Sequence, residues 1–190
     1  MQVKIEVSAR HIHPSQADLD KLFGSGFTLT KYKDLSQTGQ FAAEERVRLV
    51  GPAGVVEKVR VLGPCRKETQ VEVSETDAKT LGLEPPVRDS GDLEKSSGVK
   101  IVGPVGEVDL KRGLILALRH LHMDPATAKK LGLKNGDRVK VDVGGKRDLL
   151  FENVLVRVDS TFRLAMHIDT DEANAAGINE NNNMGEIVVR

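Results

Sequence analysis

Alternation of apolar and polar residues recurs along this chain and predicts a mainly β protein. Residues 3–7 read Val-Lys-Ile-Glu-Val, the period-two pattern of a strand with one buried face. Glycine-containing turns at residues 51–54 and 103–106 separate paired runs of this kind and indicate hairpins. Further strands are expected at residues 46–50, 55–62, 69–74, 99–102, 107–110, 113–118, 138–143, 151–158, 162–168 and 185–189.

Four short helices are expected between these strands. Ser15 is a suitable N-cap for a helix that ends before Gly24. Asp124 followed by Pro125 is a strong start signal, because Asp caps the free N–H groups and Pro fits the first helical position. Residues 74–83 and 171–177 complete the set.

The helical segments reveal an internal repeat. Residues 78–83 read Ala-Lys-Thr-Leu-Gly-Leu and residues 128–133 read Ala-Lys-Lys-Leu-Gly-Leu. Many short strands, few helices and abundant glycine turns predict two small β-barrel domains with short connecting helices. We place the halves at residues 1–90 and 98–190, approximately, and expect a linker or long loop rich in proline and charge at residues 84–97. We allow for strands exchanged between the halves.

Composition narrows the functional classes. Lys plus Arg and Asp plus Glu both count 28, so the net charge is zero, and aromatic residues make up only 3%. Nucleic-acid binding is disfavoured, because it depends on a basic excess and on aromatic stacking. No apolar run is long enough to cross a membrane, and no signal peptide is recognised. A single cysteine excludes an internal disulfide, so we expect a cytoplasmic protein.

The five histidines are the main chemical signal. Four of them form two similar segments, Arg10-His11-Ile12-His13 and Arg119-His120-Leu121-His122, and the fifth is His167. Alternate residues of a strand share a face, so each pair of histidines can reach one metal ion while Ile12 and Leu121 face a core. Imidazole suits zinc, and other divalent metals are compatible with the same ligands. Five ordinary surface or core histidines, or one shared structural zinc, are the alternatives.

The carboxylates are weaker candidates for metal ligands than the histidines. A carboxylate ligand could come from Glu72, Asp124, Asp169 or Asp171. The pattern around Glu72 favours a solvated strand residue, and the three aspartates are more typical of helix caps or of partners that orient an imidazole.

Arg66 and Cys65 lie in the turn at residues 63–67. Arg66 suits phosphate but could be an ordinary turn charge. Cys65 is better interpreted as a small buried hydrophobe than as a reactive thiol.

Four segments in order resemble the PduL-type phosphotransacylases, the phosphate propanoyltransferases linked to bacterial microcompartments. They are Val-Ser-Ala-Arg-His-Ile-His at 7–13, Gly-Pro-Cys-Arg-Lys-Glu-Thr-Gln-Val-Glu-Val-Ser at 63–74, Arg-His-Leu-His at 119–122, and His-Ile-Asp-Thr-Asp-Glu-Ala-Asn at 167–174. The resemblance implies two β-barrels with two zinc ions and the interconversion of acyl-CoA plus phosphate with acyl phosphate plus CoA. The acyl group would be acetyl or propanoyl.

The resemblance also implies roles for individual residues. One zinc would be held by His11, His13 and Glu72, and the other by His120, His122 and His167. Arg66 would bind phosphate and act in catalysis. Residues lining the CoA or phosphate site would be Val7, Ser8, Ala9, Arg60 and Asn174.

Two departures from the family pattern qualify this expectation. Microcompartment members carry an N-terminal extension, whereas this chain starts almost at the first strand, so we expect a cytoplasmic member unless an extension has been removed. Pro14 also follows the first histidine pair where an aliphatic residue is expected, which should only stiffen the chain there.

Two other functions use the same residues. A two-metal hydrolase of thioesters or phosphoesters would need similar ligands, and a zinc-stabilised, non-catalytic β-barrel could bind a partner. We further expect a homo-oligomer, a dimer or larger, because apolar strands are exposed. The acyl preference does not follow from the sequence.

Overall fold

The computed structural model describes residues 1–188, which form two compact units. One unit is Ala9–Ala117, named here the continuous barrel. The other joins Met1–Ser8 to the chain from Leu118 onward and is named the composite barrel. Each barrel has its own cluster of buried apolar side chains. No helix in the described part of the chain has the length and hydropathy needed to cross a membrane.

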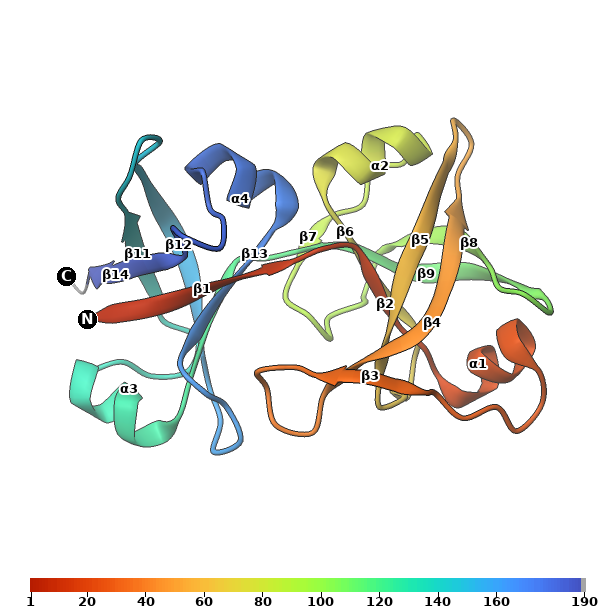
Figure 1. Cartoon of the computed structure of the whole chain (residues 1–190), viewed down its shortest axis with the longest axis horizontal. Coiled ribbons are helices and arrows are strands. Elements are labelled where there is room, and N and C mark those ends of the chain that lie inside the picture. Colours follow the sequence, from red (N-terminus) through yellow and green to blue (C-terminus); the bar gives the residue numbers. More distant parts are fainter. Residues whose placement is uncertain (189–190) are drawn as a thin grey trace. The chain divides into compact units, whose positions relative to one another are not determined.

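The composite barrel is a closed ring of six strands (Figure 1). β1 pairs with β13 on one side and with β14 on the other, which closes the ring. β10 lies between β13 and β12, and β11 lies between β12 and β14. The strands in ring order are β1 (Gln2–Ser8), β13 (Ala165–Asp169), β10 (His120–Met123), β12 (Leu149–Val158), β11 (Arg138–Val143) and β14 (Met184–Val188).

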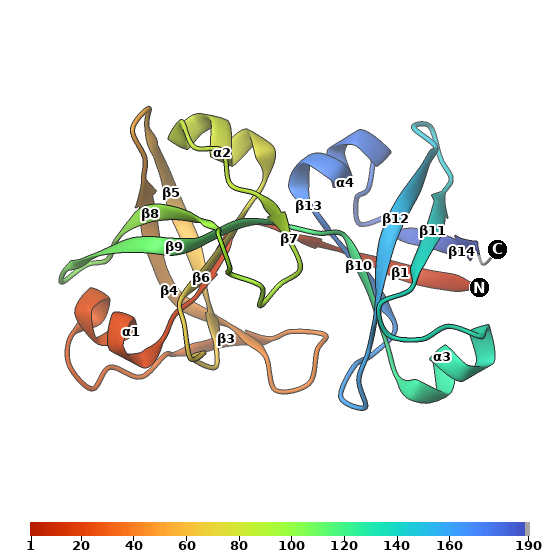
Figure 2. The same ribbon diagram turned by 180° about the vertical axis from the view of Figure 1, so that it is seen from behind.

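The continuous barrel closes in the same way (Figure 2). Its ring order is β4 (Phe41–Val50), β5 (Val55–Gly63), β2 (His11–His13), β6 (Gln70–Val73), β9 (Glu107–Ala117) and β8 (Ser97–Val102), and β8 pairs with β4. Two short strands attach outside this ring, β3 (Lys31–Asp34) to β4 and β7 (Val87–Arg88) to β9. The prediction of a mainly β fold with two barrels and short helices is therefore confirmed.

The two barrels share one pairing pattern around their histidine strands. β2 runs parallel to β5 and antiparallel to β6, and β10 runs parallel to β12 and antiparallel to β13. β6 and β13 are in turn parallel to β9 and β1. β1 leads along the chain into β2, and β9 leads into β10, so each histidine strand follows a strand of the other barrel.

The observed division of the chain differs from the expected halves at 1–90 and 98–190. The breaks fall after Ser8 and after Ala117. The stretch expected to be a linker lies within the continuous barrel, because β7 and the residues after it pair and pack there. The difference arises because β1 belongs to the composite barrel, although it directly precedes the continuous barrel in the chain. The sequence interpretation had allowed for such an exchange of strands.

Four short helices follow the expected start and stop signals. They are α1 (Gln16–Phe23), α2 (Glu75–Leu81), α3 (Pro125–Leu131) and α4 (Thr170–Ala176). Their N-caps are Ser15, Ser74, Asp124 and Asp169, whose side chains accept backbone N–H groups of the first turn. Gly82 and Gly132 end α2 and α3 with φ of 70° and 68°, a left-handed conformation that glycine adopts without strain.

Two sequence expectations need correction. The strand expected at residues 162–168 begins only at Ala165, because residues 159–164 form a turn. β3 was not expected, since its residues are all exposed and have no apolar alternation. The last expected strand, 185–189, runs from Met184 to Val188, and residue 189 lies outside the described residues.

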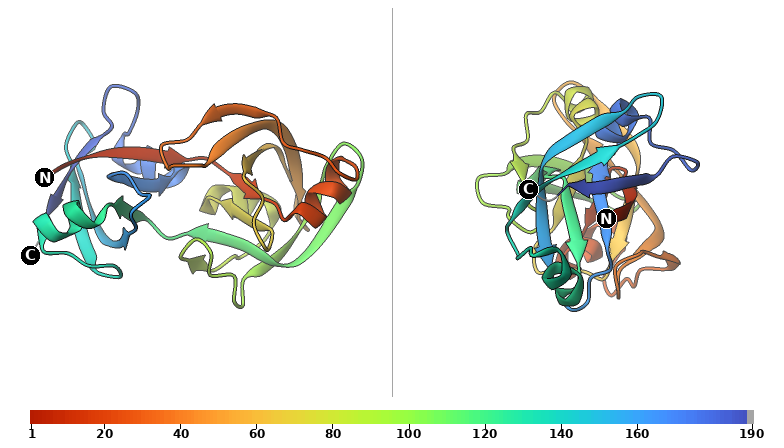
Figure 3. Two further views of the ribbon diagram at one scale, coloured as in Figure 1. Left: turned by 90° about the horizontal axis from the view of Figure 1, so that it is seen from below. Right: turned by 90° about the vertical axis from the view of Figure 1, so that its left-hand side faces the viewer.

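The apolar residue between each pair of histidines faces a barrel core, as predicted. Ile12 and Leu121 are both 0% exposed and belong to the two separate core clusters. α1 also contributes to the core of the continuous barrel through Leu22, whose carbonyl accepts the N–H of Val105 at 3.1 Å in the β8–β9 turn. The red α1 and the green turn between β8 and β9 lie side by side in Figure 3 (left). The buried spacer residues thereby hold the histidines on the opposite face of their strands.

Replacing Leu121 by alanine should lower the free energy of unfolding by about 2–5 kcal/mol, because it leaves a cavity in a closed barrel. Leu150→Ala in the same barrel is the matched control, since Leu150 is 45% exposed and should change stability by less than about 0.5 kcal/mol. Chemical denaturation of both variants measures the difference. Equal stabilities would show that Leu121 is not a core residue.

Candidate metal centres

The continuous barrel brings together His11, His13 and Glu72. The two histidines alternate along β2, and Glu72 lies opposite His11 in the antiparallel neighbour β6. One potential ligand atom from each residue lies within 4.8 Å of the others. The three residues are 7%, 3% and 8% exposed, so Glu72 is buried and is not the solvated strand residue that its local pattern favoured. The alternation argument failed there because it says which face Glu72 is on, and not what covers that face.

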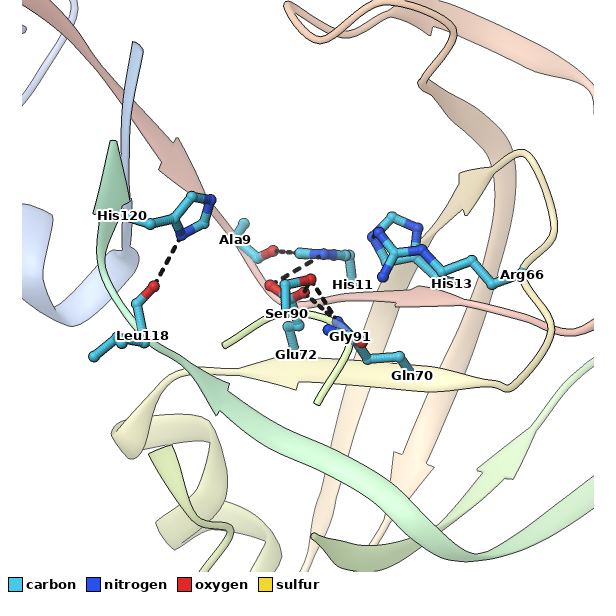
Figure 4. Close-up of polar contacts among 10 residues, drawn as sticks. All are labelled: Ala9, His11, His13, Arg66, Gln70, Glu72, Ser90, Gly91, Leu118 and His120. Atoms are coloured by element: carbon cyan, nitrogen blue, oxygen red, sulfur yellow. Dashed lines mark hydrogen bonds and ion pairs between the residues drawn. The ribbon is translucent and has the colours of Figure 1, made fainter. Parts of the chain in front are cut away.

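A backbone carbonyl orients the first imidazole. Nδ1 of His11 lies 2.8 Å from the carbonyl oxygen of Ala9, so Nδ1 carries the proton and donates it (Figure 4). Nε2 is the ring nitrogen left for a metal ion, and it lies 3.5 Å from Oε2 of Glu72. This is the tautomer that a metal ligand needs.

Glu72 is held by a hydrogen-bond network that was not predicted from the sequence. Oε1 of Glu72 accepts the amide N–H of Gln70 and the hydroxyl of Ser90, the latter at 2.8 Å (Figure 4). The Gln70 amide also donates to Ser90 Oγ, and its carbonyl oxygen accepts the N–H of Gly91 at 2.8 Å. Ser90 and Gly91 come from the stretch expected to be a linker. These bonds leave Oε2 of Glu72 facing His11.

Arg66 lies next to the second imidazole of this cluster. Its Nη2 atom is 3.0 Å from Nε2 of His13, and its backbone N–H donates to the carbonyl of Pro14 at 2.9 Å. Burial, the neighbouring His11 and the Arg66 guanidinium together hold the pKa of His13 well below its usual range. His13 is therefore a neutral imidazole at neutral pH, and the guanidinium places a positive charge beside the cluster.

The composite barrel brings together the other three histidines. His120 and His122 alternate along β10, and His167 lies opposite His120 in the antiparallel neighbour β13. Ligand atoms of the three lie within 4.8 Å of one another. Nδ1 of His120 lies 2.8 Å from the carbonyl oxygen of Leu118, which repeats the arrangement of His11 and Ala9 (Figure 4).

His122 is the most unusual residue of this cluster. It is 6% exposed, and both ring nitrogens are buried without a hydrogen-bond partner in the described structure. Burial, with smaller contributions from His120, His167 and the Arg157 charge, lowers the pKa of His122 to about 2. A buried polar group without a partner costs free energy, so His122 is stabilised only when something binds its lone pair.

Both clusters therefore fit a divalent metal ion. Each offers three donors of types that zinc binds, imidazole nitrogen or carboxylate oxygen, and all are buried except the half-buried His167. The proton of His11 and of His120 is fixed away from the centre of its cluster. The orphaned nitrogens of His122 are the strongest sign, because a bound cation would satisfy one of them.

The remaining predicted site residues are more dispersed. Val7 and Ser8 end β1 and Ala9 follows it, while Asn174 is an exposed residue of α4. Arg60 lies opposite His11 in β5 and donates to the carbonyl of Ala43 at 2.7 Å. Its guanidinium also covers the ring of Tyr32 at 5.0 Å. Contacts of these residues with CoA stay predictions.

The other candidate carboxylates lie at the starts of helices. Asp124 caps α3, and Asp169 forms a capping box with Glu172 at the start of α4. Asp171 lies in the first turn of α4. These positions agree with the interpretation of all three aspartates as helix-terminal residues.

Cys65 has the character of an unreactive thiol. Burial raises its pKa, and the charge of Asp20 raises it further, so little thiolate forms at neutral pH. We expect Cys65→Ala to retain full turnover in an acyl-transfer assay. A folded Cys65→Ala protein without activity would instead indicate a covalent thiol intermediate.

Comparisons with known proteins converge on one family. The sequence profile of the family described as Phosphate propanoyltransferase matches residues 4–179. Phosphate propanoyltransferase is also the name of a Clostridioides difficile relative that is 52% identical over 175 residues, 92% of this chain and 84% of the relative. A Thermotoga maritima protein of the same name is 56% identical over 176 residues, with 92% and 84% covered. A third, from Priestia megaterium, is 54% identical over 173 residues, with 91% and 80% covered.

Proposed function

Because this chain belongs to the phosphate propanoyltransferase family and is an acyltransferase, we propose that it interconverts acyl-CoA plus phosphate with acyl phosphate plus CoA. We propose acetyl-CoA and propanoyl-CoA as the acyl donors. One divalent metal ion, zinc by preference, is held by His11, His13 and Glu72, and a second by His120, His122 and His167. The observation that carries the metal proposal is the buried, partnerless pair of nitrogens on His122.

The reaction needs no nucleophile from the protein. A phosphate oxygen attacks the thioester carbonyl carbon, the carbon–sulfur bond breaks, and CoA leaves as the thiolate. The raised pKa of Cys65 is consistent with direct attack, because no activated thiol is required. Metal ions bound at such clusters supply Lewis-acid stabilisation for oxygen and sulfur atoms that carry negative charge during the transfer.

Arg66 binds and orients the phosphate. Its guanidinium lies against His13, at the edge of the cluster in the continuous barrel. A guanidinium can donate two parallel hydrogen bonds to one phosphate, which fixes the anion's orientation as well as its position. Holding the anion in one orientation removes part of the entropic cost of a reaction between two substrates.

The Glu72 network orients the carboxylate within the cluster of the continuous barrel. Gln70 and Ser90 both donate to Oε1 of Glu72 and so direct the other oxygen toward His11.

The decisive test is CoA release from acetyl-CoA and propanoyl-CoA with and without phosphate. We expect release only with phosphate, together with formation of acyl phosphate, which hydroxylamine traps as a hydroxamate. Phosphate-independent release with free acid as product would identify the two-metal hydrolase instead. No release from either substrate, with the protein folded, would favour the non-catalytic binding module.

A further inference from the structure

An arginine–carboxylate pair occurs at the same place in both barrels. In the continuous barrel, Nη1 of Arg10 lies 3.1 Å from Oδ1 of Asp77. In the composite barrel, Nε of Arg119 lies 2.7 Å from Oε1 of Glu172. Each arginine directly precedes the first histidine of its pair. Each carboxylate lies in the first turn of the helix that follows the strand with the third potential ligand (Figure 1).

The surroundings of the two pairs also correspond. Ser74 follows Glu72 by two residues and caps α2, and its hydroxyl accepts the N–H of Asp77. In the other barrel, Asp169 follows His167 by two residues and caps α4, and its carboxylate accepts the N–H of Glu172 at 2.8 Å. The ligand, the cap and the acidic residue thus have the same spacing, although the residue types differ at all three positions.

Stability alone does not explain the repetition. The side chain of Arg10 is 42% exposed and that of Arg119 is 34% exposed. Ion pairs that are open to water contribute little to folding. The carboxylates are more enclosed, at 10% exposed for Asp77 and 20% for Glu172. In both barrels the arginine therefore pairs with a carboxylate that is more enclosed than the arginine itself.

The position of the arginine in the chain suggests what the pair controls. The carbonyl that accepts Nδ1–H of His11 belongs to the peptide group joining Ala9 to Arg10. A peptide group is planar, so anchoring Arg10 restricts the rotation that would turn this carbonyl away. The carbonyl of Leu118, which accepts from His120, is joined to Arg119 in the same way.

We propose that Arg10–Asp77 and Arg119–Glu172 are positioning pairs, which hold the peptide group that fixes the tautomer of His11 and of His120. Each pair ties the first histidine of its cluster to the helix that follows the third ligand. The inference rests on the proposed function, because a fixed tautomer serves a bound metal ion. Neither pair contacts the reacting atoms. Its effect is on how well each cluster binds metal.

Variants with one intact cluster allow each pair to be tested separately. His122→Leu leaves only the cluster of the continuous barrel, and zinc affinity is measured by competition with a chromophoric chelator. In that background, Asp77→Asn should weaken zinc binding by about tenfold, within the range known for partners of ligating histidines. Arg10→Lys, which keeps the positive charge, should recover part of the loss when compared with Arg10→Met.

Glu75→Gln is the matched control. Glu75 also lies in the first turn of α2, but it faces Lys79 at 3.9 Å. The two substitutions remove the same charge from the same helix end, so only Asp77→Asn should change zinc affinity. The parallel experiment places Glu172→Gln in a His13→Leu background, where the cluster of the composite barrel remains.

A second measurement needs no metal. Nitrogen-15 chemical shifts of the imidazoles report which ring nitrogen carries the proton, and His11 in the metal-free protein should lose its Nδ1–H preference in Asp77→Asn. An unchanged zinc affinity and tautomer, in a background that binds one zinc, would overturn the inference and leave the proposed function intact. A background that binds no zinc would overturn the metal proposal and this inference together.

Discussion

Replacing Arg66 by alanine is expected to lower kcat/KM for phosphate by about 10²- to 10³-fold, the effect typical of losing one preorganised donor to a developing charge. The guanidinium lies 3.0 Å from His13 and is the phosphate anchor proposed for this site. Metal content should stay unchanged, because Arg66 is not among the ligands. Initial rates over a range of phosphate concentrations, together with metal analysis, measure both quantities.

Two further variants make the Arg66 test specific. Lys67→Ala removes the next positive charge along the same turn, but Lys67 is exposed, so its phosphate kinetics should match those of the parent protein. Arg66→Lys should fall between parent and alanine variant, since an ammonium group attracts phosphate without the two-pronged geometry. Parent-like phosphate kinetics in Arg66→Ala would remove Arg66 from the site.

His122→Leu should have opposite effects on the metal-free and the metal-loaded protein. In the metal-free protein, leucine replaces two buried nitrogens that lack partners in the described structure, so the free energy of unfolding should rise by about 1–3 kcal/mol. The variant should also bind one metal equivalent fewer and lose turnover. Denaturation in the presence of a chelator, and metal analysis after reloading, measure the two effects.

The variant His122→Asn separates the loss of the metal ligand from the removal of buried polar atoms. Asparagine leaves a polar group in the same buried place, so it should lose the metal without stabilising the metal-free protein. A His122→Leu protein that still binds two metal equivalents would refute the ligand assignment. A metal-free His122→Leu protein that is clearly less stable than the parent would show that the imidazole packs favourably without metal.

Local pattern predicted the parts of this fold that depend on neighbours in sequence. Alternation placed Ile12 and Leu121 in the cores and the histidines on the other face, since the strand period requires it. Helix starts at Ser15 and Asp124 followed from capping chemistry, which is also local. The paired Arg-His-apolar-His segments were recognisable because both barrels use the same strand at the same place.

Features that depend on distant pairing were not predictable in this way. The burial of Glu72 arises because the loop with Ser90 and Gly91 covers it, and nothing near Glu72 in the sequence signals that cover. The same loop was interpreted as a linker because proline, glycine and charge are typical of both linkers and ordered loops. The family resemblance selected Glu72 where the local pattern did not.

The membership of β1 in the composite barrel affects the order in which the two barrels can be completed during synthesis on the ribosome. All six ring strands of the continuous barrel lie within residues 9–117, so this barrel can close once that part has been made. β1 is synthesised before the continuous barrel, but its partners β13 and β14 come after that barrel in the chain. β1 must therefore wait for its partners until the whole continuous barrel has been made, and the histidine cluster of the composite barrel is assembled only after that.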